Sequence, residues 1–238
     1  MKMLIAISTC EAFEADGTNQ AMRETWLPDV AKHLNLDYKL FVGHGPNGHD
    51  LHPGYTKGQE MLSDVVQVDC LDDYGHLTYK TQASLRWAYE HNYEFVFRCF
   101  PDTYVRVDRL MQSNFLASCY HGDFRGEVTE AYALNYASGG AGYWLSKNAY
   151  QHLLDAPILG VWRDELMVYV EDMWVGNILG RARQAGHPIK YFDDKRFINK
   201  GQNIWPKVDN YLITAHLSAG PVKFFPGMLR AAHEGWKR

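Results

Sequence analysis

The feature that most constrains the fold is a short apolar run that ends in a proline and an acidic residue. Phe95, Val96 and Phe97 form the run, and Pro101 and Asp102 follow it. An apolar run without polar alternation predicts a strand that is buried on both faces, as in a mostly parallel sheet. In open α/β sheets, ligands bind just beyond the carboxyl ends of such strands. The Asp102 carboxylate therefore stands where a metal ion and a phosphate can bind, although the same residue can simply open a turn after Pro101.

Length and composition indicate one ordered globular domain. The chain has 238 residues, enough for one sizeable core, and 46% of them are hydrophobic. The formal net charge of -4 gives no electrostatic reason to expect a nucleic-acid partner. The sequence contains no internal repeat, low-complexity stretch or linker, so we expect a single domain over residues 1–238. Its oligomeric state is not indicated by any of these features.

The cysteines and the apolar segments indicate in which cellular compartment the protein is expected. Cys10, Cys70, Cys99 and Cys119 are far apart and form no CxxC pair, which predicts buried free thiols in a reducing environment. The apolar run at residues 3–8 is too short for the core of a signal peptide. Every apolar segment falls short of the roughly 20 residues that a membrane helix needs. We therefore expect a soluble, cytoplasmic protein without a membrane segment.

Strand and helix patterns alternate along the chain, which predicts an α/β fold. Apolar runs predict strands at residues 3–8, 38–42, 65–68, 95–97 and 211–216. Helical spacing predicts helices at residues 77–91, 110–116, 147–154 and 173–186, and a stripe of Met22, Trp26 and Val30 that Pro28 should interrupt. The strand, helix and strand between residues 65 and 97 have about the size of a βαβ unit.

Two glycine-rich segments have more than one interpretation. Residues 43–58 contain a phosphate-loop-like start and three histidines, His44, His49 and His52, but neither set has the spacing of a nucleotide or zinc site, so we predict a surface loop. Residues 138–146 place three glycines within four positions, which lets the backbone approach a ligand closely. A tight turn or a β-bulge explains the same glycines. Ser146 is a suitable N-cap for the helix that follows.

Five segments, in order, match motifs of one family. They are Met22–Trp26, with its Arg-x-Thr-Trp; Asp69–Thr81, close to Asp-x-x-Asp-x-Tyr-x-Asn-Leu-Thr-x-Lys-Thr; Asp102–Val105, the end of an Asp-Asp-Asp-Thr-Tyr-Val metal motif; Tyr136–Tyr143; and Glu171–Gly176. The chain thus resembles the β1,3-glycosyltransferases of glycosyltransferase family 31, which includes core-1 galactosyltransferases and Fringe-type N-acetylglucosaminyltransferases. Each match alone is weak, whereas five in the family's order and spacing are a strong signal.

The resemblance implies an α/β fold of the GT-A (Rossmann-like) type, with a mostly parallel central sheet flanked by helices. It also implies an inverting, metal-dependent hexosyltransferase that moves galactose or N-acetylglucosamine from a UDP-sugar to a glycan acceptor, in a β1,3 link. The chemistry is consistent with this, because a hard cation such as Mn²⁺ (or Mg²⁺) neutralises the departing diphosphate. Direct displacement also needs one base within hydrogen-bond reach of the acceptor hydroxyl.

The resemblance assigns roles at the reacting centre. Asp102 is the expected metal ligand, and His216 is the second candidate ligand, with His233 as its substitute and a structural role as its alternative. Asp172 is the expected base; it could otherwise be the N-cap of the next helix, and Glu171 could be the base in its place.

Further residues are assigned to the substrates. Arg23 and Lys80 match motif positions that face the nucleotide phosphates, although surface salt bridges would explain them too. Thr9, which follows the first strand, is assigned to the donor site with them, and Gly139 and Gly140 are expected to line the donor-sugar pocket. Three tryptophans are candidates for stacking on an acceptor sugar or for the core: Trp144, Trp162 and Trp174.

One departure from the family pattern matters. Where the family has three aspartates, this chain has Phe100, Pro101 and Asp102, so only the last carboxylate remains. The loss of the first carboxylate bears on metal affinity and donor preference. It leaves a second hypothesis, in which the chain is a non-catalytic protein that binds nucleotide sugars or glycans with a degenerate metal motif.

Overall fold

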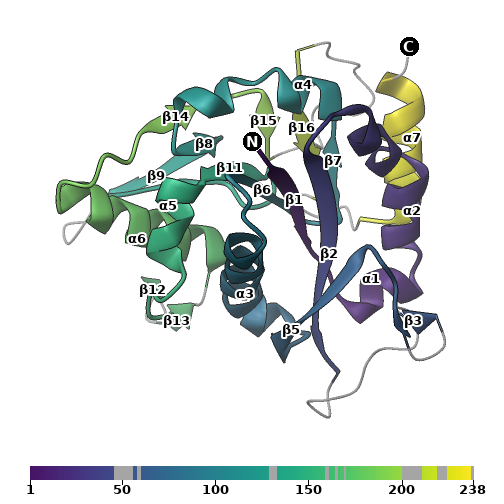
Figure 1. The fold of residues 1–238 in the computed structure, drawn as a ribbon, viewed down its shortest axis with the longest axis horizontal. Coiled ribbons are helices and arrows are strands. Elements are labelled where there is room, and N and C mark those ends of the chain that lie inside the picture. Colours follow the sequence, from purple (N-terminus) through teal and green to yellow (C-terminus); the bar gives the residue numbers. More distant parts are fainter. Residues whose placement is uncertain are drawn as a thin grey trace.

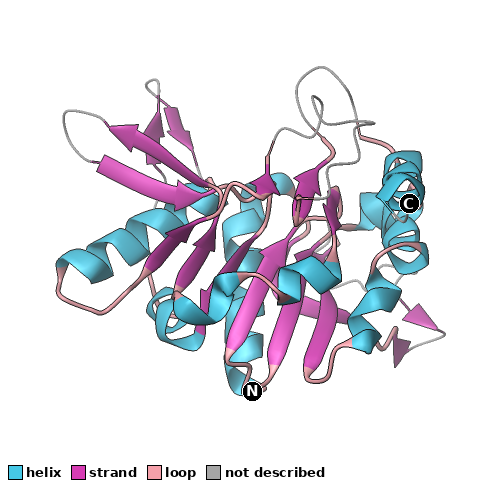
Figure 2. Ribbon diagram, turned by 90° about the horizontal axis from the view of Figure 1, so that it is seen from above, coloured by secondary structure: helices cyan, strands magenta, loops and turns pink. Residues whose placement is uncertain are grey.

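The structure, a computed structural model, describes residues 1–45, 56–57, 60–128, 133–158, 161–163, 166–168, 170–199, 211–218 and 224–236. A seven-stranded sheet forms its centre, in the order β14-β8-β11-β6-β1-β2-β5. Helices lie on both faces of this sheet (Figures 1 and 2). The predicted α/β fold with a mostly parallel central sheet is therefore confirmed.

The elements have the following bounds. The central sheet contains β1 (Met3–Ser8), β2 (Leu36–His44), β5 (Val65–Leu71), β6 (Phe95–Cys99), β8 (Tyr120–Gly122), β11 (Tyr143–Ser146) and β14 (Tyr191–Asp193). The smaller sheets contain β3 (Thr56–Lys57) with β4 (Glu60–Met61), β9 (Phe124–Val128) with β10 (Ala133–Ala137), β12 (Val161–Arg163) with β13 (Leu166–Val168), and β15 (Phe197–Ile198), β16 (Thr214–His216) and β7 (Thr103–Val105) together. The helices are α1 (Glu11–Ala15), α2 (Thr18–Glu24), α3 (Leu77–Glu90), α4 (Val107–Met111), α5 (Lys147–Tyr150), α6 (Glu171–Gln184) and α7 (Pro226–Trp236), with 3-10 turns at Leu27–Lys32, Tyr74–His76, Asn114–Ala117 and Gln151–Leu153.

Strand β1 is buried on both faces, as its unbroken apolar run predicts. Ile5 and Ile7 belong to the core that packs against α2 and α7, whereas Leu4 and Ala6 belong to the core under α3, α5 and α6. Burying both faces of a strand removes much apolar surface from water, at roughly 25 cal/mol per Å². The sheet is thus held by two hydrophobic cores, one on each side.

The strand order creates a switch point beside β1. The chain runs outward from β1 to β2 and β5, and then returns through α3 to β6, which pairs in parallel with β1 on its other side. The predicted βαβ unit therefore exists, but its two strands are separated by β2 and β1. At such a reversal the loops beyond the two central strands diverge and leave room for a ligand. Here these loops follow Ser8 and Cys99.

Several local predictions can be compared with the structure. Pro28 lies in the first residues of the 3-10 turn that follows α2, so the Met22–Val30 stripe is interrupted as predicted. Ser146 caps α5, because its Oγ accepts a hydrogen bond from the Ala149 N–H at 3.4 Å. Helix α1 was not predicted, because its five residues are too short to show a helical stripe. His49 and His52 lie outside the described residues.

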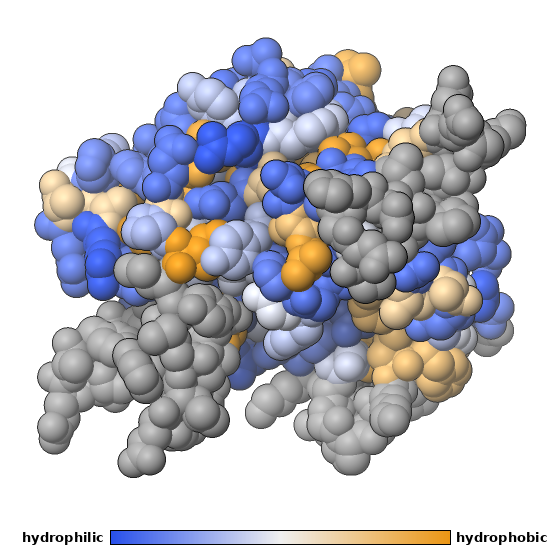
Figure 3. Space-filling view, turned by 90° about the horizontal axis from the view of Figure 1, so that it is seen from below, coloured by the Kyte–Doolittle hydropathy of each residue, from blue (hydrophilic) through white to orange (hydrophobic). Residues whose placement is uncertain are grey.

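The cysteines, the helices and the surface can be compared with the predicted compartment. All four cysteines are free thiols, as predicted, but the expectation that they are buried holds only for Cys99, since Cys10, Cys70 and Cys119 are half-buried. Within the described part of the chain, no helix is both long and apolar enough to cross a bilayer. The face shown in Figure 3 is largely hydrophilic, with hydrophobic side chains in separate groups.

Candidate active site

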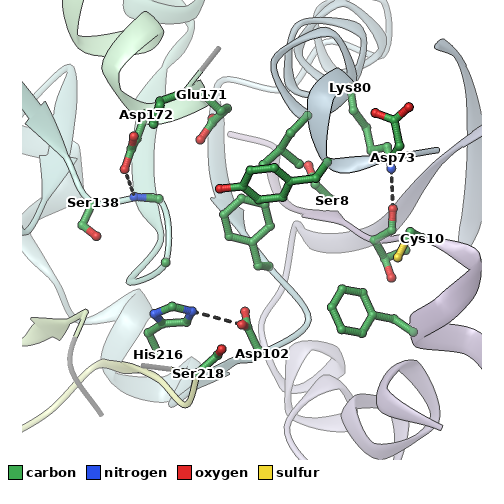
Figure 4. Close-up of a pocket in the computed structure, with 18 of the residues that line it drawn as sticks. Ser8, Cys10, Asp73, Lys80, Asp102, Ser138, Glu171, Asp172, His216 and Ser218 are labelled. Atoms are coloured by element: carbon green, nitrogen blue, oxygen red, sulfur yellow. Dashed lines mark hydrogen bonds and ion pairs between the residues drawn. The ribbon is translucent and has the colours of Figure 1, made fainter. Parts of the chain in front are cut away.

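A cavity of about 540 Å³ opens beyond the carboxyl ends of β1 and β6. Four segments that are distant in sequence line it: the residues after β1, the Asp72–Lys80 segment, the turn at residues 138–140, and the start of α6. Phe100, Asp102 and His216 complete its wall. Figure 4 shows Glu171 and Asp172 on one side, Lys80 and Cys10 across from them, and Asp102 with His216 at a third side. The cavity therefore lies at the switch point, beyond the end of the 95–97 strand where the sequence predicts ligand binding.

Asp102 and His216 are brought together by strand pairing. β16 runs antiparallel to β7 with His216 opposite Thr103, and the Leu217 N–H donates to the Asp102 carbonyl at 2.9 Å. As a result, His216 Nε2 lies 3.0 Å from Asp102 Oδ2. Burial lowers the pKa of His216, but the Asp102 carboxylate outweighs this effect, so that the pKa is raised above 6.5. The pair is an imidazole nitrogen and a carboxylate oxygen that face one cavity.

The glycine turn is shaped by close contacts with this pair. A Cβ on Gly140 would lie 2.6 Å from His216 Nδ1 and 2.6 Å from Asn199 Oδ1, so only glycine fits there. Gly142 has a φ of +77°, and a Cβ on it would meet Phe97 at 2.5 Å. Both interpretations of these glycines hold, because the segment is a tight turn and also lets Gly139 and Gly140 line the cavity.

The start of α6 places Asp172 at the cavity. Asp172 is the second residue of α6 and Val170 is the N-cap, so the N-cap interpretation of Asp172 was wrong. Asp172 Oδ2 accepts a hydrogen bond from the Gly139 N–H at 2.9 Å, and Oδ1 accepts one from Met173. Burial raises the pKa of Asp172 above its usual 3.8, although the Gly139 N–H and the Arg98 charge oppose the rise. The carboxylate is therefore held by the turn on one side and by its own helix on the other.

Glu171 also lines the cavity, but its side chain is almost completely buried. It is 3% exposed, its Oε1 lies 3.3 Å from Arg98 Nε, and it accepts a hydrogen bond from the Tyr143 hydroxyl. Burial raises the pKa of Glu171, with Arg98 acting in the opposite direction. The Arg98 guanidinium also stacks on Phe100, with its Cζ 3.5 Å from the ring centroid. Glu171 is thus held by buried side chains, whereas Asp172 accepts its hydrogen bonds from backbone N–H groups.

Lys80 lies on the opposite wall and is also buried. Its ammonium donates to the Thr9 carbonyl at 2.6 Å and to the Asp72 carboxylate. Asp72 in turn accepts hydrogen bonds from the backbone N–H groups of Gly43 and Glu11, each at 2.9 Å. This network ties the loop after β1 to the loop after β5, and all three of Thr9, Asp72 and Lys80 line the cavity.

Other predicted residues lie elsewhere. Arg23 pairs with Asp64 and Glu14, each at 2.8 Å, and does not line the cavity, so its expected role toward phosphates has no support from its position. His233 lies in α7, where its Nδ1 is 2.8 Å from the Tyr104 hydroxyl. Trp144 is a core residue stacked on Phe115, while the Trp162 side chain lies outside the described residues.

Sequence reasoning missed Arg98 and Tyr143. An arginine at the end of an apolar strand is a weak signal, because its partner Glu171 is 73 positions away along the chain. Trp174, the third tryptophan, is buried and donates to the Pro157 carbonyl at 3.1 Å. Ser8 also lines the cavity, and its Oγ is buried without a hydrogen-bond partner among the described residues.

The donor atoms at Asp102 and His216 suit a divalent cation that is held partly by its substrate. Carboxylate and imidazole are ligands that Mn²⁺ accepts. The Nδ1 side of His216 contacts Asn199, at 3.1 Å to the amide oxygen, an outer contact typical of a metal-binding histidine. Within the described part of the chain, no group of three or more His, Cys, Asp and Glu could hold a metal ion. A cation at Asp102 and His216 would therefore need further ligands, such as a diphosphate and water.

The sheet and the helices around it have the GT-A type of fold found in solved glycosyltransferases. A glycosyltransferase involved in the glycosylation of the major capsid of PBCV-1 superposes with a TM-score of 0.51 at 12% identity, over 98% of this chain and 100% of that one. The glycosyltransferase GlyE of Streptococcus pneumoniae TIGR4 superposes with a TM-score of 0.53 at 11% identity, over 100% of this chain and 62% of that one. At these identities the likeness concerns the fold.

The sequence comparison agrees with the motifs. Residues 18–134, just under half of the chain, match the family model described as Galactosyltransferase. This match confirms the resemblance predicted from the motifs. A comparison with curated proteins gave no match.

Proposed function

We propose that this glycosyltransferase moves galactose or N-acetylglucosamine from a UDP-sugar to a hydroxyl of a glycan acceptor, with inversion at the anomeric carbon and a β1,3 link. The observation that carries the proposal is the convergence of Asp102, His216 and Asp172 on one cavity at the switch point. The family match supports the sugar donor and the acceptor, and the cavity supports the residues assigned to them. A cation bound at Asp102 and His216 would neutralise charge on the departing diphosphate.

Asp172 is assigned as the base because the side chain of Glu171 is enclosed by other side chains. A base must reach the acceptor hydroxyl, and Glu171 is closed in by Arg98 and Tyr143. Asp172 lines the same cavity, and both of its oxygens are oriented by backbone N–H groups. In the proposed reaction, the acceptor oxygen attacks the anomeric carbon while its proton passes to Asp172. The bond between that carbon and the diphosphate oxygen breaks, and its electron pair leaves with the diphosphate.

The opposite wall is assigned to the nucleotide. Lys80 is held by Thr9 and Asp72, so its ammonium keeps one position in the cavity wall. A fixed ammonium near a diphosphate stabilises the developing charge without reorganising during the reaction. Gly139 and Gly140 present backbone instead of side chains to the donor sugar, which lets a hexose ring lie close to the turn.

The test is release of UDP from UDP-galactose, UDP-N-acetylglucosamine and UDP-glucose, each with Mn²⁺ and a panel of glycan acceptors. We expect acceptor-dependent release with one donor, and loss of release in Asp172→Asn with UDP binding retained. Asp155→Asn is the matched control, because its carboxylate is 88% exposed. Unchanged activity of Asp172→Asn would remove the base assignment.

A second function has one observation in its favour. Phe100 lines the cavity where the family has an acidic residue, and its ring packs on Arg98. A protein that binds nucleotide sugars or glycans without transfer would tolerate this loss. Calorimetry separates the two proposals: UDP binding that is independent of Mn²⁺, together with no release from any donor, would favour the binding protein.

A further inference from the structure

Arg98 is a buried cation that the proposed reaction does not yet use. Its side chain is 0% exposed, and the Glu171 carboxylate is its ion-pair partner among the described residues. Burying two charges costs much of what their attraction returns, and such pairs often stabilise a fold no better than apolar residues of the same size. Two of its nitrogens, Nε and Nη2, have no hydrogen-bond partner within the described part of the chain. Stability alone is therefore a poor explanation for an arginine here.

The contacts of Arg98 converge on Asp172. Arg98 Nε faces Glu171, which precedes Asp172 in α6. Arg98 Nη1 lies 3.5 Å from the carbonyl of Gly139, the residue whose N–H binds Asp172 Oδ2. Arg98 thus touches both of the elements that hold the Asp172 carboxylate, the start of α6 and the glycine turn.

Phe100, which lies close to Asp102 in the sequence, also orients the Arg98 side chain. Phe100 stacks on the guanidinium plane, with the Arg98 Cζ 3.5 Å from its ring centroid, and lies two residues before Asp102. Cation–π stacking of this kind fixes the plane of a guanidinium. A Cβ on Gly139 would approach Glu171, Arg98 and Phe100 at 3.1 to 3.4 Å, so the turn lies directly on this group. Phe100, which replaces the family's first aspartate, therefore packs against Arg98 and the Gly139 turn.

We propose that Arg98 is a positioning residue for the proposed transfer, which holds Glu171 and the Gly139 turn so that Asp172 stays in place as a carboxylate. This inference rests on the proposed function for its catalytic meaning, but its physical content can be measured without turnover. The charged and titratable groups that face Asp172 in the described structure are Glu171 on its own helix, Arg98 on β6 and Tyr120 on β8. Arg98 is the cation of this set.

The experiment compares the parent with Arg98→Met, Arg98→Lys and the double variant Arg98→Met with Glu171→Gln. The pKa of Asp172 is measured by NMR on protein labelled with ¹³C at aspartate carboxyls, and its signal is identified by its absence in Asp172→Asn. We expect Arg98→Met to raise this pKa by about 0.5 or more, because a nearby cation is lost. Arg98→Lys should keep the pKa near the parent value. Arg23→Met is the control, since it removes an ion-paired arginine that is remote from the cavity.

Kinetics give the second readout. Arg98→Met should lower kcat about tenfold or more and leave the KM for the donor within about twofold. A structural role alone would lower the unfolding midpoint and leave the pKa of Asp172 unchanged. If Arg98→Met fails to fold, the double variant is compared with the single variant Glu171→Gln, so that only Arg98 differs and the pKa of Asp172 should be higher in the double variant. An unchanged Asp172 pKa in Arg98→Met relative to the parent, or in the double variant relative to Glu171→Gln, overturns the inference, whereas a parent without transferase activity overturns only the proposed function.

Discussion

The ring of His216 occupies the space that a side chain at position 140 would need: a Cβ on Gly140 would lie 2.6 Å from its Nδ1 and 2.8 Å from its Cε1. The turn cannot easily move away, because Thr103 Oγ1 donates to the Gly140 carbonyl at 2.9 Å. In a densely packed interior such an overlap is relieved by moving the softer partner. Here the groups that can move are the imidazole of His216 and the side chain of Asn199, whose Oδ1 would also lie 2.6 Å from the Cβ.

Gly140→Ala should therefore displace His216 from Asp102. We expect the Mn²⁺-dependent part of UDP binding to weaken about tenfold or more, which corresponds to about 1.4 kcal/mol. Calorimetry of UDP with and without Mn²⁺ measures this part. Gly180→Ala is the control, because the nearest atom to a Cβ there is the Tyr191 hydroxyl at 4.0 Å. Binding by Gly140→Ala equal to that of the parent would mean that His216 does not hold the cation.

Gly176 sets how closely α6 packs on β10. A Cβ at this position would lie 2.5 Å from the Tyr136 Cβ and 2.7 Å from the Asn135 carbonyl. Gly176→Ala should lower the free energy of unfolding by about 1–3 kcal/mol, the usual cost of overpacking. Because Asp172 lies on the same helix, transferase activity should fall as well. Urea unfolding checks the first effect, with Gly180→Ala expected to be neutral or to stabilise the helix by up to about 1 kcal/mol; equal stabilities of the two variants would contradict the packing argument.

The strands could be predicted from the sequence because their cause is local. Residues 3–8 and 95–97 are apolar without alternation, and both are buried on two faces. Contacts between residues that are far apart in the sequence cannot be predicted from such local patterns. His216 and Asp102 are 114 positions apart, and their contact depends on the antiparallel register of β16 and β7.

The same difference between local patterns and long-range contacts applies to the candidate site. Motif matches located Asp102, Asp172 and the glycine turn, but they could not tell which acidic residue was accessible. That difference arises from Arg98 and Tyr143, which enclose Glu171. Nor could they show that Arg23 pairs with Asp64, 41 positions away, on another part of the molecule.

Asp194 should make stability depend on pH. Its carboxylate is buried, yet hydrogen bonds from Arg196 and His121 hold its pKa well below the usual 3.8. A lowered folded pKa adds stability that is present above the unfolded pKa and is lost as pH falls toward the folded one. Asp194→Asn should therefore lower the free energy of unfolding by about 2 kcal/mol at neutral pH, and by progressively less below about pH 4.

The control for Asp194 is Asp155→Asn. Asp155 is 88% exposed, and its pair with Arg86 is open to solvent. Exposed pairs contribute about 0–1 kcal/mol, so this variant should unfold close to the parent at every pH. Urea unfolding at several pH values tests both, and a difference between parent and Asp194→Asn that does not shrink in acid would contradict the linkage.

The ionisation of Asp172 should determine how kcat falls as the pH is lowered. Burial raises its folded pKa above 3.8, so the carboxylate becomes protonated at a higher pH than an exposed aspartate would. Since the proposed base acts as the carboxylate, kcat should fall as pH is lowered through this raised pKa. Measurement of kcat at saturating donor, acceptor and Mn²⁺ reports this ionisation in the bound enzyme. A kcat that stays constant down to the pH of an ordinary aspartate would argue against Asp172 as the base.

Substitutions of Asp102 and Asp73 can separate the effect of a charge at the proposed metal site from the effect of the total charge of the cavity. Both line the cavity, but Asp102 contacts His216, whereas Asp73 caps the 3-10 turn by accepting a hydrogen bond from the His76 N–H at 2.9 Å. Asn can accept at both positions, so each fold should survive. Asp102→Asn should reduce the gain in UDP affinity from Mn²⁺ by about tenfold or more, because an amide oxygen lacks the carboxylate's charge. Asp73→Asn should keep that gain, and equal losses in the two variants would mean that the cation senses the cavity's total charge and not a ligand at Asp102.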